Sequence, residues 1–210
     1  MKHAEQSQRK SPEFNLIQIP QVITREEARE LIQFHKTHPH LLKDDTSPLY
    51  HKRKIPIEHI KTNWIRTLVR KLEYLAISEI AMRTGEKVFP EQSEIMCFPN
   101  GTEIPKHIDV YDDSEGNTIH PNTTWSAVVY LNHGNQGGGP MDYNGGHLIF
   151  EPCEQLPMGL SYNPEICEMV LFQGMDFHHS VSKVYRGDRY TLPMWFTTNI
   201  LDIRPESPIL

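Results

Sequence analysis

His107 and Asp109 could bind one metal ion together, because a single residue separates them in the segment PNGTEIPKHIDV. Side chains at positions i and i+2 of a β-strand leave the same face, so an imidazole and a carboxylate would project side by side. Taken alone the pattern is weak, since a hydrogen-bonded pair on the surface has the same spacing. Two imidazoles and one carboxylate on one face of an octahedron would leave three positions open, which suits ferrous iron with a bidentate cosubstrate and dioxygen.

A second segment, FHHSVSKVYRGDRYTLPMWF, offers two candidates for the missing histidine, His178 and His179. It also carries Arg189 among apolar residues. Strand alternation would place two sets of residues on opposite sides: Arg189, Thr191, Pro193 and Trp195, and Tyr190, Leu192, Met194 and Phe196. Both sides are mostly apolar, so we expect Arg189 to point inward. Its guanidinium then needs an anion, either a bound carboxylate or a protein Asp or Glu.

Two helices are predicted before these segments. FNLIQIPQVITREEARELIQFHKTH is typical of a short strand followed by a helix that begins at Thr24, with Glu27 completing a capping box. A longer amphipathic helix is predicted from Ile60 to about Thr84, and Gly85 would end it. Their apolar stripes would cover one face of a sheet.

After this helix, short β-like runs follow one another, separated by Gly, Pro, Asn and Asp. The runs are SEIMCF, WSAVVYLN, GHLIF, CEMVLFQ, HSVSKV and RYTLPMWF. Such a series indicates an antiparallel sandwich or jelly roll, so the predicted fold class is α+β. The Gly-rich segment 134–146 is expected to be a flexible loop or lid, since no Walker-type lysine follows it.

Length and composition predict a single domain. A chain of 210 residues with 38% hydrophobic content can bury one core, and the polar residues 1–13 are expected to form a flexible tail before a domain at 14–210. There is no apolar signal-peptide core and no run of about 18 apolar residues. The three cysteines form no CxxC pair and are expected to be free thiols. These features predict a soluble, cytoplasmic protein without membrane contact.

The charge is segregated along the chain. The formal net charge is -6, and residues 88–180 hold thirteen acidic residues against one lysine. Negative charge disfavours nucleic-acid binding and weakly favours a basic substrate. The basic segment 51–54 is expected to be a solvated loop.

Several of these motifs, in this order, resemble the prolyl-hydroxylase group of iron(II)- and 2-oxoglutarate-dependent dioxygenases. The resemblance covers about residues 94–198 and is carried by His107-x-Asp109, Tyr130-Leu131-Asn132, Gly145-Gly146 with Phe150, and HSVSKVYRGDRY. It implies a double-stranded β-helix (jelly-roll) core with N-terminal helices packed on one sheet. It also implies Fe(II), 2-oxoglutarate and O2 as cofactor and cosubstrates, with ascorbate as a reductant.

The resemblance also assigns roles to residues. In that family the distal histidine lies nine or ten residues before the basic residue that binds the far carboxylate of 2-oxoglutarate, which points to His179 rather than His178. The implied metal ligands are therefore His107, Asp109 and His179. The implied 2-oxoglutarate ligands are Arg189, the Tyr130 hydroxyl and, more weakly, Thr191. The chain departs from the family at Phe98, Ile104 and Leu148, which changes the expected lining of the pocket.

The activity implied by the resemblance is hydroxylation of an unactivated C–H bond with release of succinate and CO2. The expected substrate is a prolyl or other amino-acid residue in a protein or peptide, or a free amino acid. Two other interpretations stay open. One is a cupin-like metal-binding jelly roll acting as an isomerase or hydrolase, and the other is a catalytically silent peptide-binding module. The cupin-like interpretation does not require Arg189 at its observed spacing, and the presence of all three metal ligands argues against the silent module.

Overall fold

The computed structural model describes residues 13–47, 50–109, 111–112, 118–119, 122–134 and 142–204. All but the last residue of the predicted tail, and most of the Gly-rich segment 134–146, lie outside these ranges. Among the described residues, no helix combines the length and apolar character needed to cross a membrane.

Both predicted helices are present. Helix α1, Arg25–Thr37, begins after Thr24, which accepts a hydrogen bond from the Glu27 amide while the Glu27 carboxylate accepts one from the Thr24 amide, so the capping box is confirmed. Helix α2, Asn63–Thr84, ends at Gly85, whose φ of 75° is the left-handed conformation that glycine adopts without steric cost. Helix α2 starts three residues later than predicted, because a 3-10 turn, Ile57–His59, and an extended Ile60 precede it.

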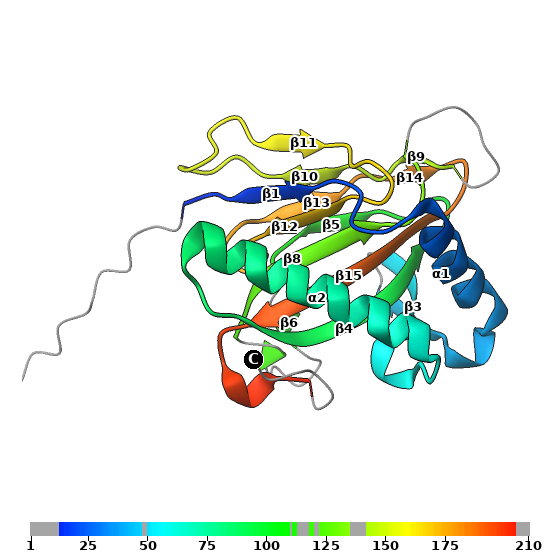
Figure 1. Cartoon of the computed structure of the whole chain (residues 1–210). Coiled ribbons are helices and arrows are strands. Elements are labelled where there is room, and N and C mark those ends of the chain that lie inside the picture. The colour runs from blue at the N-terminus through cyan, green and yellow to red at the C-terminus, as the bar shows by residue number, and fades with distance from the viewer. Residues whose placement is uncertain are drawn as a thin grey trace, which may run out of the picture.

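The largest sheet has seven strands, in the order β1-β12-β8-β15-β4-β3-β2, with every pair antiparallel. Its strands are β1 Leu16–Ile19, β2 Lys43–Ser47, β3 Tyr50–Pro56, β4 Phe89–Phe98, β8 Thr123–Tyr130, β12 Met169–Phe172 and β15 Arg189–Thr197. Figure 1 shows β15 and β8 running through the middle of this sheet.

A second antiparallel sheet has the order β11-β10-β13-β5. Its strands are β5 Ile104–His107, β10 Leu148–Phe150, β11 Leu160–Tyr162 and β13 His179–Val181. Two short pairs complete the described strands: β6 Tyr111–Asp112 with β7 Thr118–Ile119, and β9 Asn144–Gly145 with β14 Val184–Tyr185. Two antiparallel sheets with few helices are consistent with a jelly roll.

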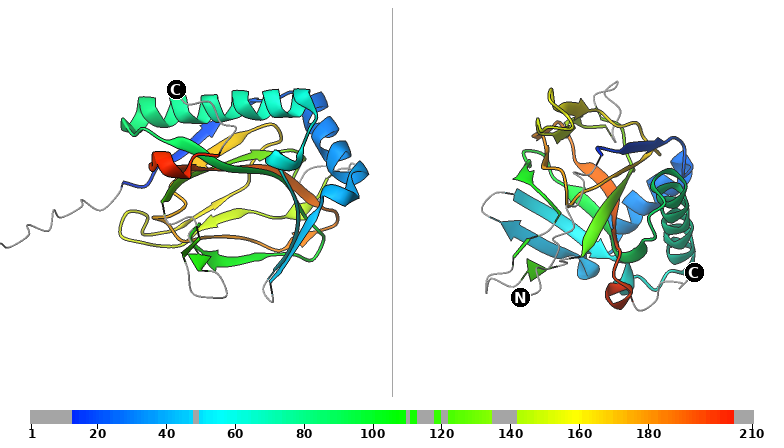
Figure 2. Two further views of the ribbon diagram at one scale, coloured as in Figure 1. Left: turned by 90° about the horizontal axis from the view of Figure 1, so that it is seen from below. Right: turned by 90° about the vertical axis from the view of Figure 1, so that its left-hand side faces the viewer.

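The core lies on both faces of the seven-stranded sheet. On one face, a single hydrophobic cluster contains buried residues of α1 and α2 together with alternate residues of β4, β8, β12 and β15, and Figures 1 and 2 show α2 running along the outside of the sheet. On the other face, a smaller cluster around Tyr130, Phe150 and Phe172 joins the two sheets. The strand residues of the large sheet therefore divide between a helix-facing side and a side that faces the small sheet.

The hairpin of β2 and β3 was not predicted. The prediction of a solvated loop at 51–54 is wrong, because these residues belong to β3 and pair with β2 and β4. The hairpin carries many charged residues and extends the sheet through backbone hydrogen bonds. It therefore lacks the apolar alternation by which a strand is recognised in a sequence.

Candidate functional site

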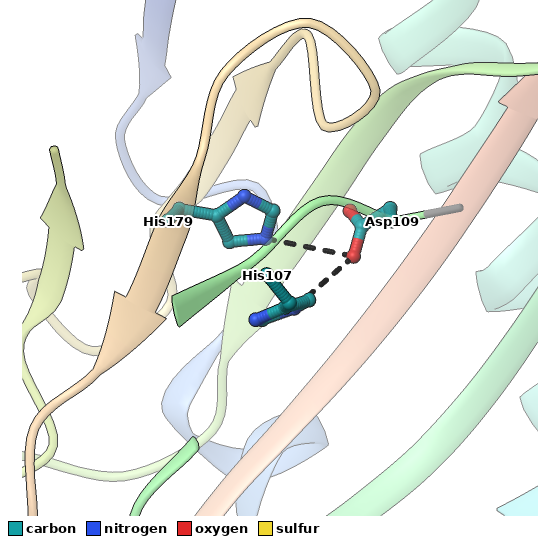
Figure 3. A group of neighbouring side chains, drawn as sticks. All are labelled: His107, Asp109 and His179. Atoms are coloured by element: carbon teal, nitrogen blue, oxygen red, sulfur yellow. Dashed lines mark ion pairs between the residues drawn. The ribbon is translucent and has the colours of Figure 1, made fainter. Parts of the chain in front are cut away.

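His107, Asp109 and His179 meet in space. Their ligand atoms all lie within 4.8 Å of one another, and the Asp109 Oδ1 atom is 3.5 Å from the Nε2 atom of each histidine. Figure 3 shows the three side chains converging, with His179 on β13 and the other two from the segment at the end of β5. Ligand atoms about 2.1 Å from one metal ion and at right angles are about 3 Å apart, so the two separations of 3.5 Å are only slightly wider than the edge of an octahedral face.

Both histidines present the same nitrogen to the shared space. The Nδ1 atom of His107 is 2.9 Å from the Pro105 carbonyl oxygen, and the Nδ1 atom of His179 is 3.0 Å from the Phe177 carbonyl oxygen. Each Nδ1 donates to a carbonyl two residues earlier, so Nε2 is the nitrogen of each ring that faces the shared space and can bind a metal. The two rings are therefore oriented toward one common cation.

Asp109 reaches the cluster by a different route from the one predicted. It lies two residues beyond the end of β5, in a bend, so strand alternation does not place it beside His107. Its amide instead donates to the Gly174 carbonyl oxygen at 2.9 Å. A Cβ atom at position 174 would collide with the Asp109 Oδ2 and Ser126 Oγ atoms, so the close approach requires glycine.

The two oxygens of the Asp109 carboxylate have different partners. Oδ2 accepts a hydrogen bond from the Ser126 hydroxyl on β8, while Oδ1 faces both histidines. Burial alone would raise the pKa of Asp109, but His179 and then His107 outweigh it, so the pKa lies well below its ordinary value. Burial would likewise lower the pKa of His179, and the Asp109 charge reverses this and raises it. The carboxylate is therefore held ionised, as a metal ligand must be.

The cluster opens into a cavity of about 510 Å³ between the two sheets. The alternation predicted for β15 is confirmed here: Arg189, Thr191, Pro193 and Trp195 line the cavity, and Tyr190, Leu192, Met194 and Phe196 belong to the helix-facing core. His178 is exposed and lines the cavity, whereas the neighbouring His179 is buried and meets His107 and Asp109.

Arg189 is buried in this cavity with 3% of its surface exposed. Its guanidinium lies 5.3 Å from the centre of the Phe98 ring and 5.2 Å from that of Tyr130. No acidic side chain in the described part of the chain forms an ion pair with it, and its Nε atom lacks a hydrogen-bond partner. A buried cation among aromatic rings calls for an anionic partner, and since no carboxylate among the described residues supplies it, a bound anionic ligand is favoured over a protein ion pair.

Two neighbours prepare Arg189 for such a ligand. The Asn132 side chain donates to the Asp188 carbonyl oxygen and accepts from the Tyr190 amide, both at 2.8 Å, so it fixes the backbone on each side of Arg189. The Tyr130 hydroxyl is fully buried without a hydrogen-bond partner. Burial raises the pKa of Tyr130, against the effect of Arg189, so the phenol stays protonated and can donate to a carboxylate.

Thr191 is the third predicted 2-oxoglutarate residue, and it lies beside Tyr130. The two residues are cross-strand partners on β15 and β8, and both line the cavity. Ser126 and Gly174 were not predicted as site residues. The small polar Ser126 within the apolar run WSAVVYLN was the available signal for the first, and nothing in the sequence marks the second.

The chain was compared with known proteins by sequence and by structure. The model of a family described as the 2OG-Fe(II) oxygenase superfamily matches residues 93–197. Comparison with curated proteins found no match.

Several solved structures resemble this chain. A prolyl-4-hydroxylase from Pseudomonas putida is 19% identical, with a TM-score of 0.65 over 88% of this chain and 92% of that one. A Trichoplax adhaerens prolyl hydroxylase, in complex with a peptide fragment of the hypoxia inducible factor oxygen degradation domain, is 17% identical, with a TM-score of 0.67 over 87% and 83%. The non-heme alpha ketoglutarate dependent epimerase SnoN from nogalamycin biosynthesis is 13% identical, with a TM-score of 0.63 over 94% and 87%. At these identities the likeness shows a shared fold.

Proposed function

Because the chain belongs to the 2OG-Fe(II) oxygenase superfamily, we propose that it hydroxylates an unactivated C–H bond of a prolyl or other amino-acid residue in a protein or peptide. Membership makes the chain an oxidoreductase that uses Fe(II) and 2-oxoglutarate with dioxygen. It favours this activity over a cupin-like isomerase or hydrolase and over a silent binding module. The observation that carries the proposal is one cavity that holds both the His-Asp-His cluster and the buried Arg189.

His107, Asp109 and His179 would hold the iron. Their Nε2 and Oδ1 atoms face one another at separations close to those of an octahedral site, and a hydrogen bond at the opposite atom of each side chain fixes its orientation. Nitrogen and carboxylate ligands on one face are the donor set of non-heme Fe(II) oxygenases. When bound, iron and 2-oxoglutarate supply the oxidising power for attack of dioxygen on a C–H bond, with succinate and CO2 as co-products.

Arg189, Tyr130 and Thr191 would bind the far carboxylate of 2-oxoglutarate. The guanidinium supplies charge and paired donors, and the unpartnered Tyr130 hydroxyl supplies a further donor. The surrounding Phe98, Met96 and Leu148 side chains are buried and exclude water from this end of the cavity. In a dry environment these hydrogen bonds are stronger than in water.

A peptide substrate is supported by the Trichoplax structure, which holds a peptide fragment. We further propose that residues 14–210 act as one catalytic domain and that ascorbate is a reductant. Cytoplasmic location belongs to the same proposal and is supported by the unpaired thiols of Cys97, Cys153 and Cys167.

Epimerisation is the second candidate, favoured by the likeness to SnoN. The two outcomes differ in the product, because hydroxylation adds one oxygen atom to the substrate and epimerisation adds none. Mass spectrometry of the product separates them.

The first experiment adds ferrous iron and then 2-oxoglutarate to the metal-free protein without oxygen. We expect the weak visible charge-transfer absorption of chelated 2-oxoglutarate in wild type and in His178→Ala, and its loss in His179→Ala. The His178 variant is the matched control, since it removes the neighbouring imidazole. Tight binding of zinc or manganese without any such band in wild type would contradict the proposal.

A further inference from the structure

One acidic residue in the cavity has no part in the proposed metal or 2-oxoglutarate site. Glu94, on β4, lines the cavity and is completely buried. Burial of a carboxylate is costly unless its oxygens are hydrogen-bonded or paired. The contacts of each carboxylate oxygen therefore show which hydrogen bonds the Glu94 side chain lacks.

The two oxygens of Glu94 differ in their partners. Oε1 lies 3.1 Å from the Lys54 ammonium and accepts a hydrogen bond from the Gln92 amide. Oε2 is buried without a hydrogen-bond partner. A carboxylate oxygen has room for two donors, so the Glu94 side chain is only half satisfied.

The position of Glu94 is fixed by the register of the sheet. On β4 it lies between Met96, the partner of Thr191, and Gln92, the partner of Trp195. On the other side of β15, Thr191 pairs with Tyr130 and Trp195 pairs with Ser126. Along the strand direction, Glu94 thus lies between the proposed carboxylate site and the proposed metal site. Across the sheet, it lies one strand away from β15, toward β3.

The cavity that Glu94 lines has room for a substrate. A volume of about 510 Å³ is in the range that holds drug-sized ligands, so the cavity has space beyond 2-oxoglutarate itself. The Glu94 oxygen, the Tyr130 hydroxyl and the Arg189 Nε are three of the four buried side-chain atoms without partners among the described residues. The latter two face the proposed cosubstrate, which leaves Glu94 for the substrate.

We propose that Glu94 recognises the substrate by accepting a hydrogen bond from a neutral N–H donor, such as the backbone amide of a peptide. The inference rests on the proposed function. The donor is neutral because Lys54 already balances the Glu94 charge. A cationic substrate group would leave a net positive charge in a largely buried place, whereas an amide N–H meets the missing hydrogen bond at no charge cost.

The test compares two pools of blocked peptides of mixed sequence that differ only in methylation of the backbone nitrogens. Succinate release above the level without peptide is measured for wild type. We expect the unmethylated pool to stimulate succinate release and the methylated pool to have little effect. For the most active peptide, Glu94→Gln should raise the KM by about tenfold or more, because the charged acceptor is lost. Glu26→Gln, an exposed carboxylate on α1, is the matched control and should follow wild type.

The outcomes separate this inference from the proposed function. An equal response to both pools, or a response to free lysine or arginine but to neither pool, would overturn the role of Glu94 while leaving the oxygenase proposal intact. No response to either pool, in a protein that shows the anaerobic 2-oxoglutarate band, would also overturn it. Absence of that band would mean that the proposed function itself fails.

Discussion

Among single residues, Asp109 depends most on its surroundings. Its Oδ1 atom faces the two histidines only because the Ser126 hydroxyl occupies Oδ2 and the Gly174 carbonyl holds the Asp109 amide. Partners of this kind orient a ligand and tune its affinity for the metal. Ser126 should therefore matter for metal binding although it does not reach the cluster centre.

Ser126→Ala should weaken metal affinity by about 10- to 100-fold, because the carboxylate loses the donor that fixes its orientation. Titration of the metal-free protein with Mn(II) measures the effect, and Ser161→Ala, at an exposed position on β11, serves as control. If both variants bind the metal as wild type does, the hydrogen bond from Ser126 has no role in orienting Asp109.

The reactivity of the three cysteine thiols tests how deeply each one is buried. Burial raises the pKa of the Cys97 thiol to about 11 and also raises that of Cys167, whereas Cys153 is only half-buried. The thiolate is the reactive form, so a raised pKa suppresses reaction at mildly alkaline pH. We expect one fast-reacting thiol in the native protein and three after denaturation, measured with a chromogenic disulfide reagent. Cys153→Ser should remove the fast phase, and a fast phase that survives this change would contradict the prediction.

Much of the geometry of the candidate site could be predicted for single residues, although the reasons differ from residue to residue. The inward direction of Arg189 followed from strand alternation, and the structure agrees. His179 followed from its spacing to Arg189 in the family, since His178 and His179 are chemically identical in the sequence. The position of Asp109 in a bend could not be predicted, because a hydrogen bond to Gly174, distant in the chain, determines it.

Among the elements, the segment that follows β15 is joined to helix α2 by an ion pair. Arg204 lies beyond the 3-10 turn Ile200–Asp202, and its guanidinium is 2.9 Å from Glu73 Oε1 and 3.0 Å from Oε2. The Ser93 hydroxyl of β4 also donates to Glu73, at 2.6 Å. Burial raises the pKa of Glu73, and Arg204 opposes this. The pair thus joins helix, sheet and chain end in one buried contact.

Arg204→Met should destabilise the protein by about 3 kcal/mol, because it leaves a buried carboxylate without its cation. The double variant Glu73→Met with Arg204→Met should recover much of this loss, since no isolated charge remains. Urea unfolding gives both free energies of unfolding. Arg83→Met, which removes an exposed i,i+4 pair with Glu79, is the control and should change the free energy by less than about 1 kcal/mol. A double variant no more stable than Arg204→Met alone would contradict this account.

The helices and central strands could be predicted from the sequence and the β2–β3 hairpin could not, for a physical reason. The helices and the central strands have strong apolar periodicity, and the caps at Thr24 and Gly85 mark helix boundaries chemically. The β2–β3 hairpin has no such pattern, yet it places Lys52 and Lys54 in the wall of the cavity. Charged strands that are held by backbone hydrogen bonds have no recognisable sequence pattern. They can be identified only once the sheet that they extend is known.

For the whole molecule, the candidate site is shared between the two sheets. His107 and His179 come from the small sheet or its edge, whereas Ser126, Tyr130 and Arg189 come from the large one. Ligands bound between them should connect the sheets and stabilise the folded state by mass action.

Mn(II) and 2-oxoglutarate together, each at about 100 times its dissociation constant, should raise Tm by roughly 10 to 20 °C, because binding contributes about 2.7 kcal/mol for each of the two ligands. Thermal unfolding without oxygen measures this. The shift with both ligands should exceed that with the metal alone, and Arg189→Met should abolish the difference. A wild-type protein with the same Tm in metal alone and in both ligands would contradict the shared site.

Successive residues of strand β15 have different roles, since one side of the strand packs under the helices and the other faces the cavity. Natural variation can therefore exchange Trp195, Pro193 or their β4 neighbours Gln92 and Glu94 while the residues between them remain under selection for folding. A lineage carrying this fold could acquire new substrates by changes on one side of two strands. In the laboratory, a library restricted to the same positions would diversify specificity from a scaffold that stays folded.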